Sequence, residues 1–194
     1  MLPTTTSMML DALEDPSDEP TWREFDARFR GVLVGFAMRF GLGADDAAEV
    51  AQEALSAFVD EYRRGQYDRG RGRLRSWLFA ITRDRVLRYR EGLARRRDWR
   101  GASAMEELPN PDRQSEIWEQ EWRESLLLEG VRQLKESAGL GERTLRAFEG
   151  LTLEGRDGAE LARELDMTEN AVYQAKFRAM EQLRAIVARL EQDE

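Results

Sequence analysis

Apolar side chains recur at intervals of three and four residues along most of the chain, and no stretch alternates apolar and polar residues as a β-strand does. The clearest run consists of Trp22, Phe25, Phe29, Leu33, Phe36 and Phe40. The spacing predicts helices that begin near residues 21 and 45, and further helices over about 76–97, 117–138, 142–149, 157–165 and 169–190. This pattern predicts an all-α fold.

Prolines and glycines divide the helical segments into two groups. Residues 1–20 are polar and contain two prolines near their end, so we expect a flexible N-terminal segment, although Met8 to Leu13 can form one short amphipathic turn. The sequence predicts a first helical bundle over 21–100, a flexible linker over 101–116, a second bundle over 117–190 and a tail over 191–194.

The chain contains neither cysteine nor histidine. Their absence excludes disulfides, thiolate zinc sites, Ser–His nucleophile systems and the Glu-x-x-His pairs of di-iron bundles. We therefore expect no enzymatic activity, no metal and no cofactor. There is no long apolar run, and the acidic first twenty residues do not resemble a secretory signal, so we expect a cytoplasmic protein without a membrane partner.

Charge is distributed very unevenly around the net value of −8. Residues 1–62 carry 4 basic and 13 acidic side chains, and residues 101–194 carry 12 basic and 21 acidic ones. Between them, residues 63–100 carry 14 arginines and only 4 acidic residues, a net charge of +10. A block of arginines indicates an anion-binding surface, because the guanidinium group matches phosphates and base edges.

Residues 159–183 have the spacing of a helix-turn-helix. Leu161, Ala162 and Leu165 are predicted to point inward from the first helix, and Val172, Ala175, Ala179 and Leu183 from the second. Asp166 and Met167 form the turn, where Asp tolerates a left-handed conformation, and Thr168 is the expected N-cap. The residues left on the outward side can read DNA in the major groove: Asn170, Tyr173, Gln174, Phe177 and Arg178.

An acidic helix, a glycine-containing loop, an arginine-rich helix and a C-terminal helix-turn-helix follow one another along the chain. In this order the sequence resembles a bacterial sigma factor of the two-domain, extracytoplasmic-function type. Residues 46–53 resemble its acidic polymerase-binding motif, residues 67–81 its promoter-melting loop and the helix that follows, and residues 161–183 its region-four reader. The stretch from Tyr67 to Leu78 is the strongest single match, and the resemblance covers roughly residues 21–100 and 117–190.

The resemblance implies a function in transcription initiation. The first bundle would be region two, which binds the β′ clamp helices of core RNA polymerase and melts the minus-ten element of promoter DNA. The second bundle would be region four, which binds the minus-thirty-five element and touches the β flap. An anti-sigma factor is a further partner that such proteins commonly have.

The resemblance also implies three sets of site residues. The polymerase-binding set is Asp46, Glu49, Gln52 and Glu53. The minus-ten set is Arg69, Arg71, Arg73, Arg75, Trp77, Arg83 and Arg88, of which Trp77 is alternatively a core residue. The minus-thirty-five set is Thr168, Asn170, Tyr173, Gln174, Phe177 and Arg178.

Two other functional classes remain open from the sequence. One is a stand-alone helix-turn-helix regulator, which predicts a symmetric dimer in which Trp118 and Trp122 could form the dimer helix. The other is a carboxylate metalloenzyme, which the lack of histidine strongly disfavours.

Overall fold

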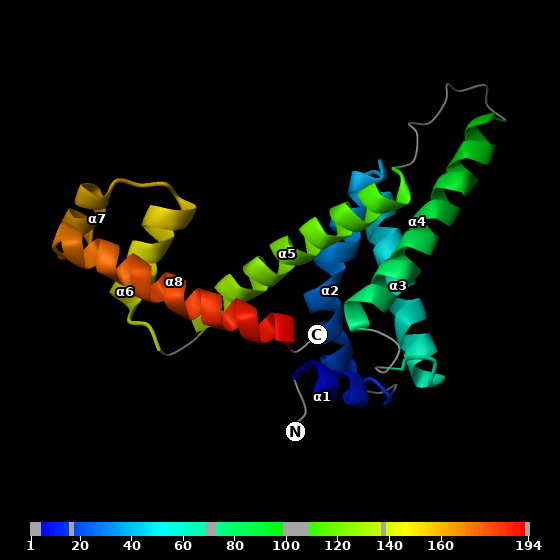
Figure 1. Cartoon of the computed structure of the whole chain (residues 1–194), viewed down its shortest axis with the longest axis horizontal. Helices are drawn as coiled ribbons and strands as arrows, with labels where there is room; N and C mark the ends of the chain where they lie inside the picture. The colour runs from blue at the N-terminus through cyan, green and yellow to red at the C-terminus, as the bar shows by residue number, and fades with distance from the viewer. Residues whose placement is uncertain (1–4, 16–17, 69–72, 99–108, 137–138, 193–194) are drawn as a thin grey trace. The chain divides into compact units, whose positions relative to one another are not determined.

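A computed structural model describes residues 5–15, 18–68, 73–98, 109–136 and 139–192 (Figure 1). All regular elements among these residues are helical, which confirms the all-α prediction. The chain divides into two compact units, one containing residues 1–125 and the other residues 126–192. The boundary falls inside a single helix, α5 (Pro111–Glu136).

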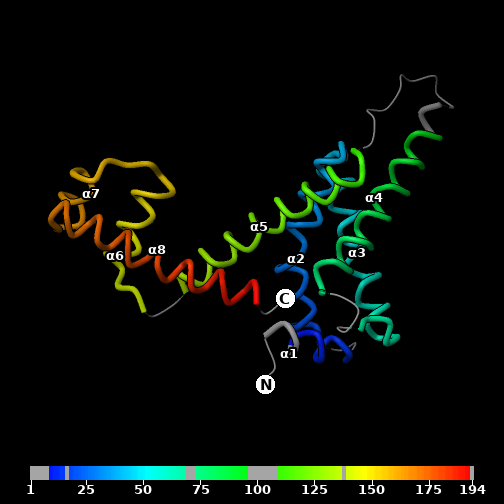
Figure 2. Tube along the Cα trace, viewed as in Figure 1, coloured from blue at the N-terminus to red at the C-terminus, as the bar shows by residue number. Residues whose placement is uncertain are grey.

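The first unit contains α1 (Thr5–Ala12), α2 (Glu19–Arg39), α3 (Ala44–Arg63), α4 (Leu74–Asp98) and the first half of α5. Helix α3 packs against both α2 and α4 (Figure 2). The core is unusually aromatic, and its fully buried rings are Phe25, Phe29, Phe36, Phe40 and Phe58. These are the phenylalanines of the predicted apolar run together with one ring from α3.

Helix α2 starts earlier than the sequence indicates. Asp18 is the N-cap, because its carboxylate accepts hydrogen bonds from both the backbone N–H and the hydroxyl of Thr21. Pro20 lies in the first turn, where the missing N–H has no helical partner to lose. Pro20, one of the two prolines near the end of the segment that was expected to be flexible, therefore helps to begin the helix.

The N-terminal segment, expected to be flexible over residues 1–20, contains a docked helix. Helix α1 and the residue after it bury Met9, Leu10 and Leu13 to 6%, 1% and 1% exposure. Burial of these three apolar side chains holds the segment in place, although its overall composition is polar. The amphipathic turn expected between Met8 and Leu13 is present.

The first half of α5 belongs to the first unit. Trp118 and Trp122 are each only 2% exposed, and they pack on Phe29, Phe36 and Phe79 with ring centroids 5.4 to 5.8 Å apart. The approach is close at Gly35 of α2, where a Cβ atom would overlap the Glu121 carboxylate. The two tryptophans are thus core residues of the first unit.

Part of the predicted linker is helical. Residues 99–108 lie outside the described residues, but α5 already begins at Pro111. The side chain of Asn110 accepts a hydrogen bond from the backbone N–H of Arg113 at 2.8 Å, as a helix N-cap does. Asn110-Pro111 therefore starts a helix, although the same pair is common in loops.

The second unit contains the rest of α5, α6 (Glu142–Phe148), a π-helical turn η1 (Glu149–Leu153), α7 (Gly158–Glu164) and α8 (Glu169–Gln192). The bounds of α6, α7 and α8 agree with the predicted ranges within two residues, and only the π-helical turn was not expected. At Gly150 in this turn, an added Cβ would lie 2.6 Å from Leu161, so the small residue allows η1 and α7 to pack closely. Two small clusters form the core, one around Leu161, Val172 and Ala175 and the other around Phe148 and Leu183.

Candidate nucleic-acid interface

Helix α3 presents an acidic face at its N-terminal half. Glu49 and Glu53 are exposed and lie four residues apart on the same face. Glu53 is 3.9 Å from Arg85 of α4, a distance at the limit of an ion pair, and its own side chain is exposed. The two carboxylates are therefore accessible to a partner.

The other two residues of the predicted polymerase-binding set are engaged within the chain. Asp46 is half-buried and accepts a hydrogen bond from the Tyr89 hydroxyl at 2.6 Å. Gln52 is exposed but accepts a hydrogen bond from Arg30. The same guanidinium binds Asp26 in α2, and this hydrogen bond raises the pKa of Arg30. Asp46 and Gln52 thus tie α3 to its neighbours, whereas Glu49 and Glu53 are the accessible acids of the set.

Helix α4 separates a buried stripe from a basic outer surface. The stripe consists of residues four apart, namely Leu74, Leu78, Thr82, Val86 and Arg90. Arg90 is only 7% exposed and donates a hydrogen bond at 2.8 Å to the carbonyl of Phe40, at the C-terminal end of α2. A cation there satisfies a carbonyl that the helix leaves unpaired. Arg90 therefore has a structural role. The sequence alone did not distinguish it from the other arginines of the basic block over residues 63–100.

The arginines of the predicted minus-ten set differ in their surroundings. Arg69 and Arg71 lie outside the described residues. Arg73 and Arg88 are exposed, whereas Arg75 forms an ion pair with Glu119 of α5 at 3.3 Å. Arg83 lies 5.7 Å above the ring of Phe79 and pairs with Asp84 at 3.2 Å. Four of the six predicted arginines are thus placed on or just before α4, and two of these four are exposed.

Trp77 lies at the rim of a cavity of about 250 Å³. Its ring is half-buried, meets the core ring of Phe58 edge-on and is parallel to Tyr67, with centroids 4.9 Å apart and planes at 6°. Trp77 therefore combines a core contact with a place at a cavity. Residues of the loop after α3 and of the start of α4 line the cavity: Gln66, Tyr67, Asp68, Arg73, Ser76, Trp77 and Ala80.

Tyr67 is a candidate site residue that the predicted minus-ten set omits. It provides one face of the stacked pair with Trp77 and a wall of the cavity. The ten-residue separation between the two aromatics gives no periodic signal, because a loop and a helix supply one each. Only the Gly-rich composition of the loop could have indicated that the chain turns back there.

Residues 159–183 take in α7, the turn after it and the first half of α8. Leu161, Val172 and Ala175 are at most 1% exposed, and Ala179 and Leu183 continue this inner stripe. Asp166 adopts a left-handed conformation with φ of 52°, as expected for the turn. The Thr168 hydroxyl accepts a hydrogen bond from the N–H of Ala171 at 3.2 Å, which confirms its role as a cap.

The predicted reader residues lie on the outer side of α8 and at its N-cap. All six are exposed: Thr168, Asn170, Tyr173, Gln174, Phe177 and Arg178. Phe177 is 70% exposed, far more than a core aromatic. Tyr173 packs its ring over Gly158 at the start of α7, where an added Cβ would lie 2.9 Å from the phenol oxygen. The surface therefore offers two aromatic groups, two amides and a guanidinium.

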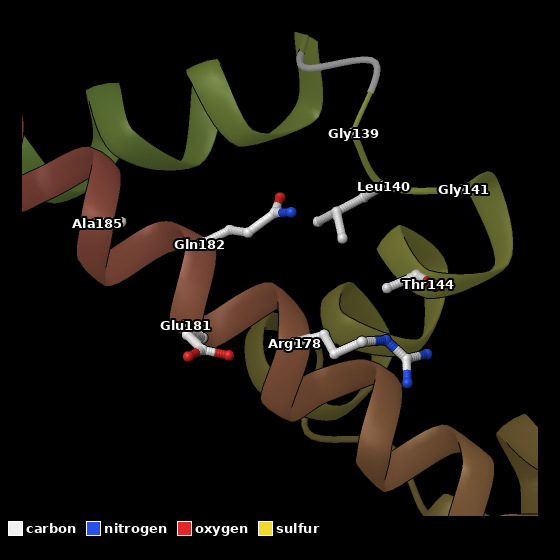
Figure 3. A pocket seen from close by; sticks show the side chains of 8 residues that line it. All are labelled: Gly139, Leu140, Gly141, Thr144, Arg178, Glu181, Gln182 and Ala185. Carbon is white, nitrogen blue, oxygen red and sulfur yellow. The ribbon is translucent and has the colours of Figure 1, made fainter.

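Arg178 also borders a cavity of about 390 Å³ between α8 and the start of α6 (Figure 3). Thr144 and the Gly139–Gly141 turn form the opposite wall, and Glu181 and Gln182 continue the side of α8. Arg178 thus stands one to two turns beyond Asn170 and Gln174, across this cavity from the turn before α6.

A three-residue ion network braces α6 against α7. Glu164 accepts hydrogen bonds from Arg146 at 2.8 Å and from Arg156 at 2.5 Å. The hydrogen bond from Arg156, followed by its positive charge, lowers the pKa of Glu164, and the same bond raises the pKa of Arg156. The network lies on the surface, so we expect it to orient the helices and to add little to stability.

Two features are absent from the described part of the chain. None of its helices is long and apolar enough to cross a membrane. Among the same residues, no group of three or more acidic side chains has the arrangement of a metal site.

Residues 26–100 match the family model for sigma-70 region 2. No curated protein matches the chain. The matched segment runs from the first turns of α2 past the end of α4, and it includes the acidic face of α3, the aromatic cavity and the basic helix. The part of the chain from residue 26 to residue 100, which is less than half of the sequence, is thus similar to sigma-70 region 2.

Proposed function

We propose that the protein is a two-domain sigma factor of the extracytoplasmic-function type. In this proposal the first unit binds core RNA polymerase and melts the minus-ten element, and the second unit binds the minus-thirty-five element as duplex DNA. The observation that carries the proposal is the combination, within one small unit, of an accessible acidic pair, a basic helix and an aromatic cavity.

The acidic pair is the proposed polymerase contact. Glu49 and Glu53 would face basic side chains of the β′ clamp helices, where complementary charge speeds docking and fixes orientation. Asp46 and Gln52 would support this face indirectly through Tyr89 and Arg30.

The cavity beside Trp77 is the proposed site for an unpaired base of the minus-ten element. Its volume of about 250 Å³ is slightly smaller than that of typical pockets for drug-sized ligands, as expected for a single base. Extrusion of a base costs a few kcal/mol, and stacking on an aromatic ring returns about 1–3 kcal/mol. Arg73 at the cavity and Arg88 further along α4 would hold the phosphates of the melted strand.

The outer side of α8 is the proposed duplex reader. Asn170 and Gln174 can form paired hydrogen bonds to adenine, and Phe177 can contact a thymine methyl group. Arg178 borders the same cavity as Thr144 and the turn before α6, a position that suits a phosphate contact as well as a base contact. The two roles differ in their consequences, because loss of a phosphate contact weakens binding to all sequences and reduces its salt dependence.

The stand-alone regulator has less support than it had from the sequence. The helix that was to form its dimer surface buries Trp118 and Trp122 inside the first unit. These two side chains are therefore not available for a symmetric dimer contact, and the sigma factor is the function we propose.

Run-off transcription with core polymerase tests the proposal. Over a library of promoters, the protein should direct initiation from a subset of sequences that share minus-thirty-five and minus-ten elements. Core polymerase with the double variant Glu49→Arg/Glu53→Arg serves as the matched control. Transcripts that do not depend on the protein, or that persist with the double variant, would contradict the proposed mechanism.

A further inference from the structure

We propose that the N-terminal helix α1 is a positioning element for the aromatic cavity. It would hold the end of α3 and, through it, the loop that carries Tyr67 into the cavity wall. The inference rests on the proposed function, because it assigns the cavity to promoter melting.

The first observation is that α1 is anchored by burial. Leu10 and Leu13 are among the most completely buried side chains of the first unit, at 1% exposure each, and Met9 is 6% exposed. Burial keeps these three apolar side chains out of water, which favours the docked position of the segment. This burial fixes the position of α1 against the first unit, so α1 can in turn hold the end of α3 in place.

The second observation is that polar contacts of this segment fall on the last turn of α3. Arg63 donates a hydrogen bond from Nε to the carbonyl of Leu13 at 2.8 Å, in a partly buried position. The Tyr62 hydroxyl donates to a carboxylate oxygen of Asp11 at 3.3 Å. Both partners on α3 are its final two residues, directly before the loop.

The third observation is that the loop is attached to this same turn. The N–H of Gly65 donates to the carbonyl of Tyr62 at 2.8 Å, and the N–H of Gln66 donates to the carbonyl of Glu61 at 3.0 Å. Gly65 has φ of 69°, a left-handed conformation that turns the chain sharply out of the helix. The position of Tyr67 therefore depends on the last turn of α3.

A chain of aromatic rings completes the connection. The ring of Tyr62 is stacked on the core ring of Phe58 at 6.3 Å and lies 6.1 Å from that of Tyr67, which in turn lies flat against Trp77 at 4.9 Å. Tyr67 and Trp77 line the cavity, and Tyr62 is the ring that Asp11 of α1 contacts. Helix α1 thus acts through Tyr62 and supplies none of the residues that line the cavity.

Undocking α1 should disturb the cavity and leave the polymerase contact intact. The variant Leu10→Asp/Leu13→Asp places two charges where the segment is buried. The matched control is Glu14→Ala, which changes an exposed residue of the same segment. With core polymerase, we expect the undocked variant to bind as the parent does but to form about tenfold fewer open complexes, measured by permanganate footprinting, which corresponds to about 1.4 kcal/mol. The control and the conservative variant Leu13→Met should melt promoter DNA as the parent does.

Near-ultraviolet circular dichroism provides a readout that needs neither polymerase nor DNA. The parallel pair of Tyr67 and Trp77 should contribute a signal that the undocked variant loses and the Glu14→Ala control keeps. This result would support positioning even if the parent protein did not melt promoters, in which case the proposed function alone would fail. An unchanged dichroism signal together with unchanged melting would overturn the inference and leave the proposed function standing.

Two further outcomes are decisive. More open complexes in the undocked variant would mean that α1 masks the cavity, and the inference would be wrong. If the undocked variant loses polymerase binding, the exposed substitution Asp11→Ala decides: we expect it to reduce melting about two- to threefold, a change of roughly 0.5 kcal/mol in keeping with one solvent-exposed hydrogen bond. Melting equal to that of Glu14→Ala would overturn the inference.

Discussion

Reversal of the acidic pair on α3 should weaken polymerase binding far more than it destabilises the fold. Among the described residues, the double variant Glu49→Arg/Glu53→Arg loses one ion pair, between Glu53 and Arg85 at 3.9 Å. Exposed pairs contribute about 0.2–1 kcal/mol, and an arginine introduced beside Arg85 would add a repulsion of similar size. We therefore expect the free energy of unfolding to fall by no more than about 2 kcal/mol.

The effect on binding should be much larger. Like charges that meet across an interface cost several kcal/mol, so two reversals should weaken binding by at least about 3 kcal/mol, or more than a hundredfold. A control with the same change in net charge is Glu24→Arg/Glu191→Arg, since both residues are exposed and lie on α2 and α8, outside the acidic face. The control should bind polymerase nearly as well as the parent.

Co-purification with core polymerase and urea unfolding measure the two quantities. The reasoning predicts weak capture of the α3 variant, normal capture of the control and similar unfolding midpoints for both. Equal capture of the two variants would refute the assignment of this face to polymerase.

Three other predictions concern the second unit. Leu183→Ala should destabilise it by about 2–5 kcal/mol in urea unfolding, because the side chain is buried. Gln174→Ala should leave stability unchanged and cost about 1–3 kcal/mol of discrimination at one base in a binding selection. The reverse pattern would mean that Leu183, and not Gln174, lies on the face of α8 that reads DNA. Asp166→Val should lower stability by about 1–2 kcal/mol and Asp166→Asn should not, since φ is 52° at this position; equal unfolding midpoints for the two variants would contradict the role of the left-handed turn. The lowered pKa of Glu164 gives stability that is fully present above its ordinary pKa of 4.5 and is lost as the pH falls through the lower folded-state pKa. Glu164→Gln should therefore remove this acid sensitivity. Identical pH dependence of unfolding in parent and variant would show that the ion network contributes nothing to stability.

The sequence predicted the helices well where one periodic face was buried. The stripe from Val172 to Leu183 and the phenylalanines of α2 needed no information beyond their spacing. The outward residues of α8 followed from the same periodicity, because a helix that buries one face exposes the other.

The sequence did not indicate which unit a helix would join. Trp118, Trp122 and Leu134 share one periodicity along α5, yet the tryptophans pack in the first unit and Leu134 in the second. Likewise, Asn110-Pro111 is equally compatible with a loop and a helix start, and Pro20 with a helix end and a first turn. Such choices depend on which surfaces meet in three dimensions, and local patterns do not contain that information.

The candidate site was only partly predictable for the same reason. Glu49 and Glu53 share a helix face by their spacing alone. The pairing of Tyr67 with Trp77, the engagement of Asp46 by Tyr89 and the burial of Arg90 each join different elements of the fold. An arginine in a basic block looks the same in the sequence whether it is structural or free to bind DNA.

Fluorescence anisotropy on a promoter duplex, across a salt series with and without core polymerase, tests the central claim most directly. The free chain should bind poorly, because its net charge of −8 opposes approach to a polyanion despite the +10 block in residues 63–100. Core polymerase should turn on tight, sequence-specific binding, since Glu49 and Glu53 would then face the enzyme and both DNA-binding units would act on one promoter. Tight, sequence-specific binding by the free chain at physiological salt, unchanged by polymerase, would contradict the sigma factor and favour a stand-alone regulator.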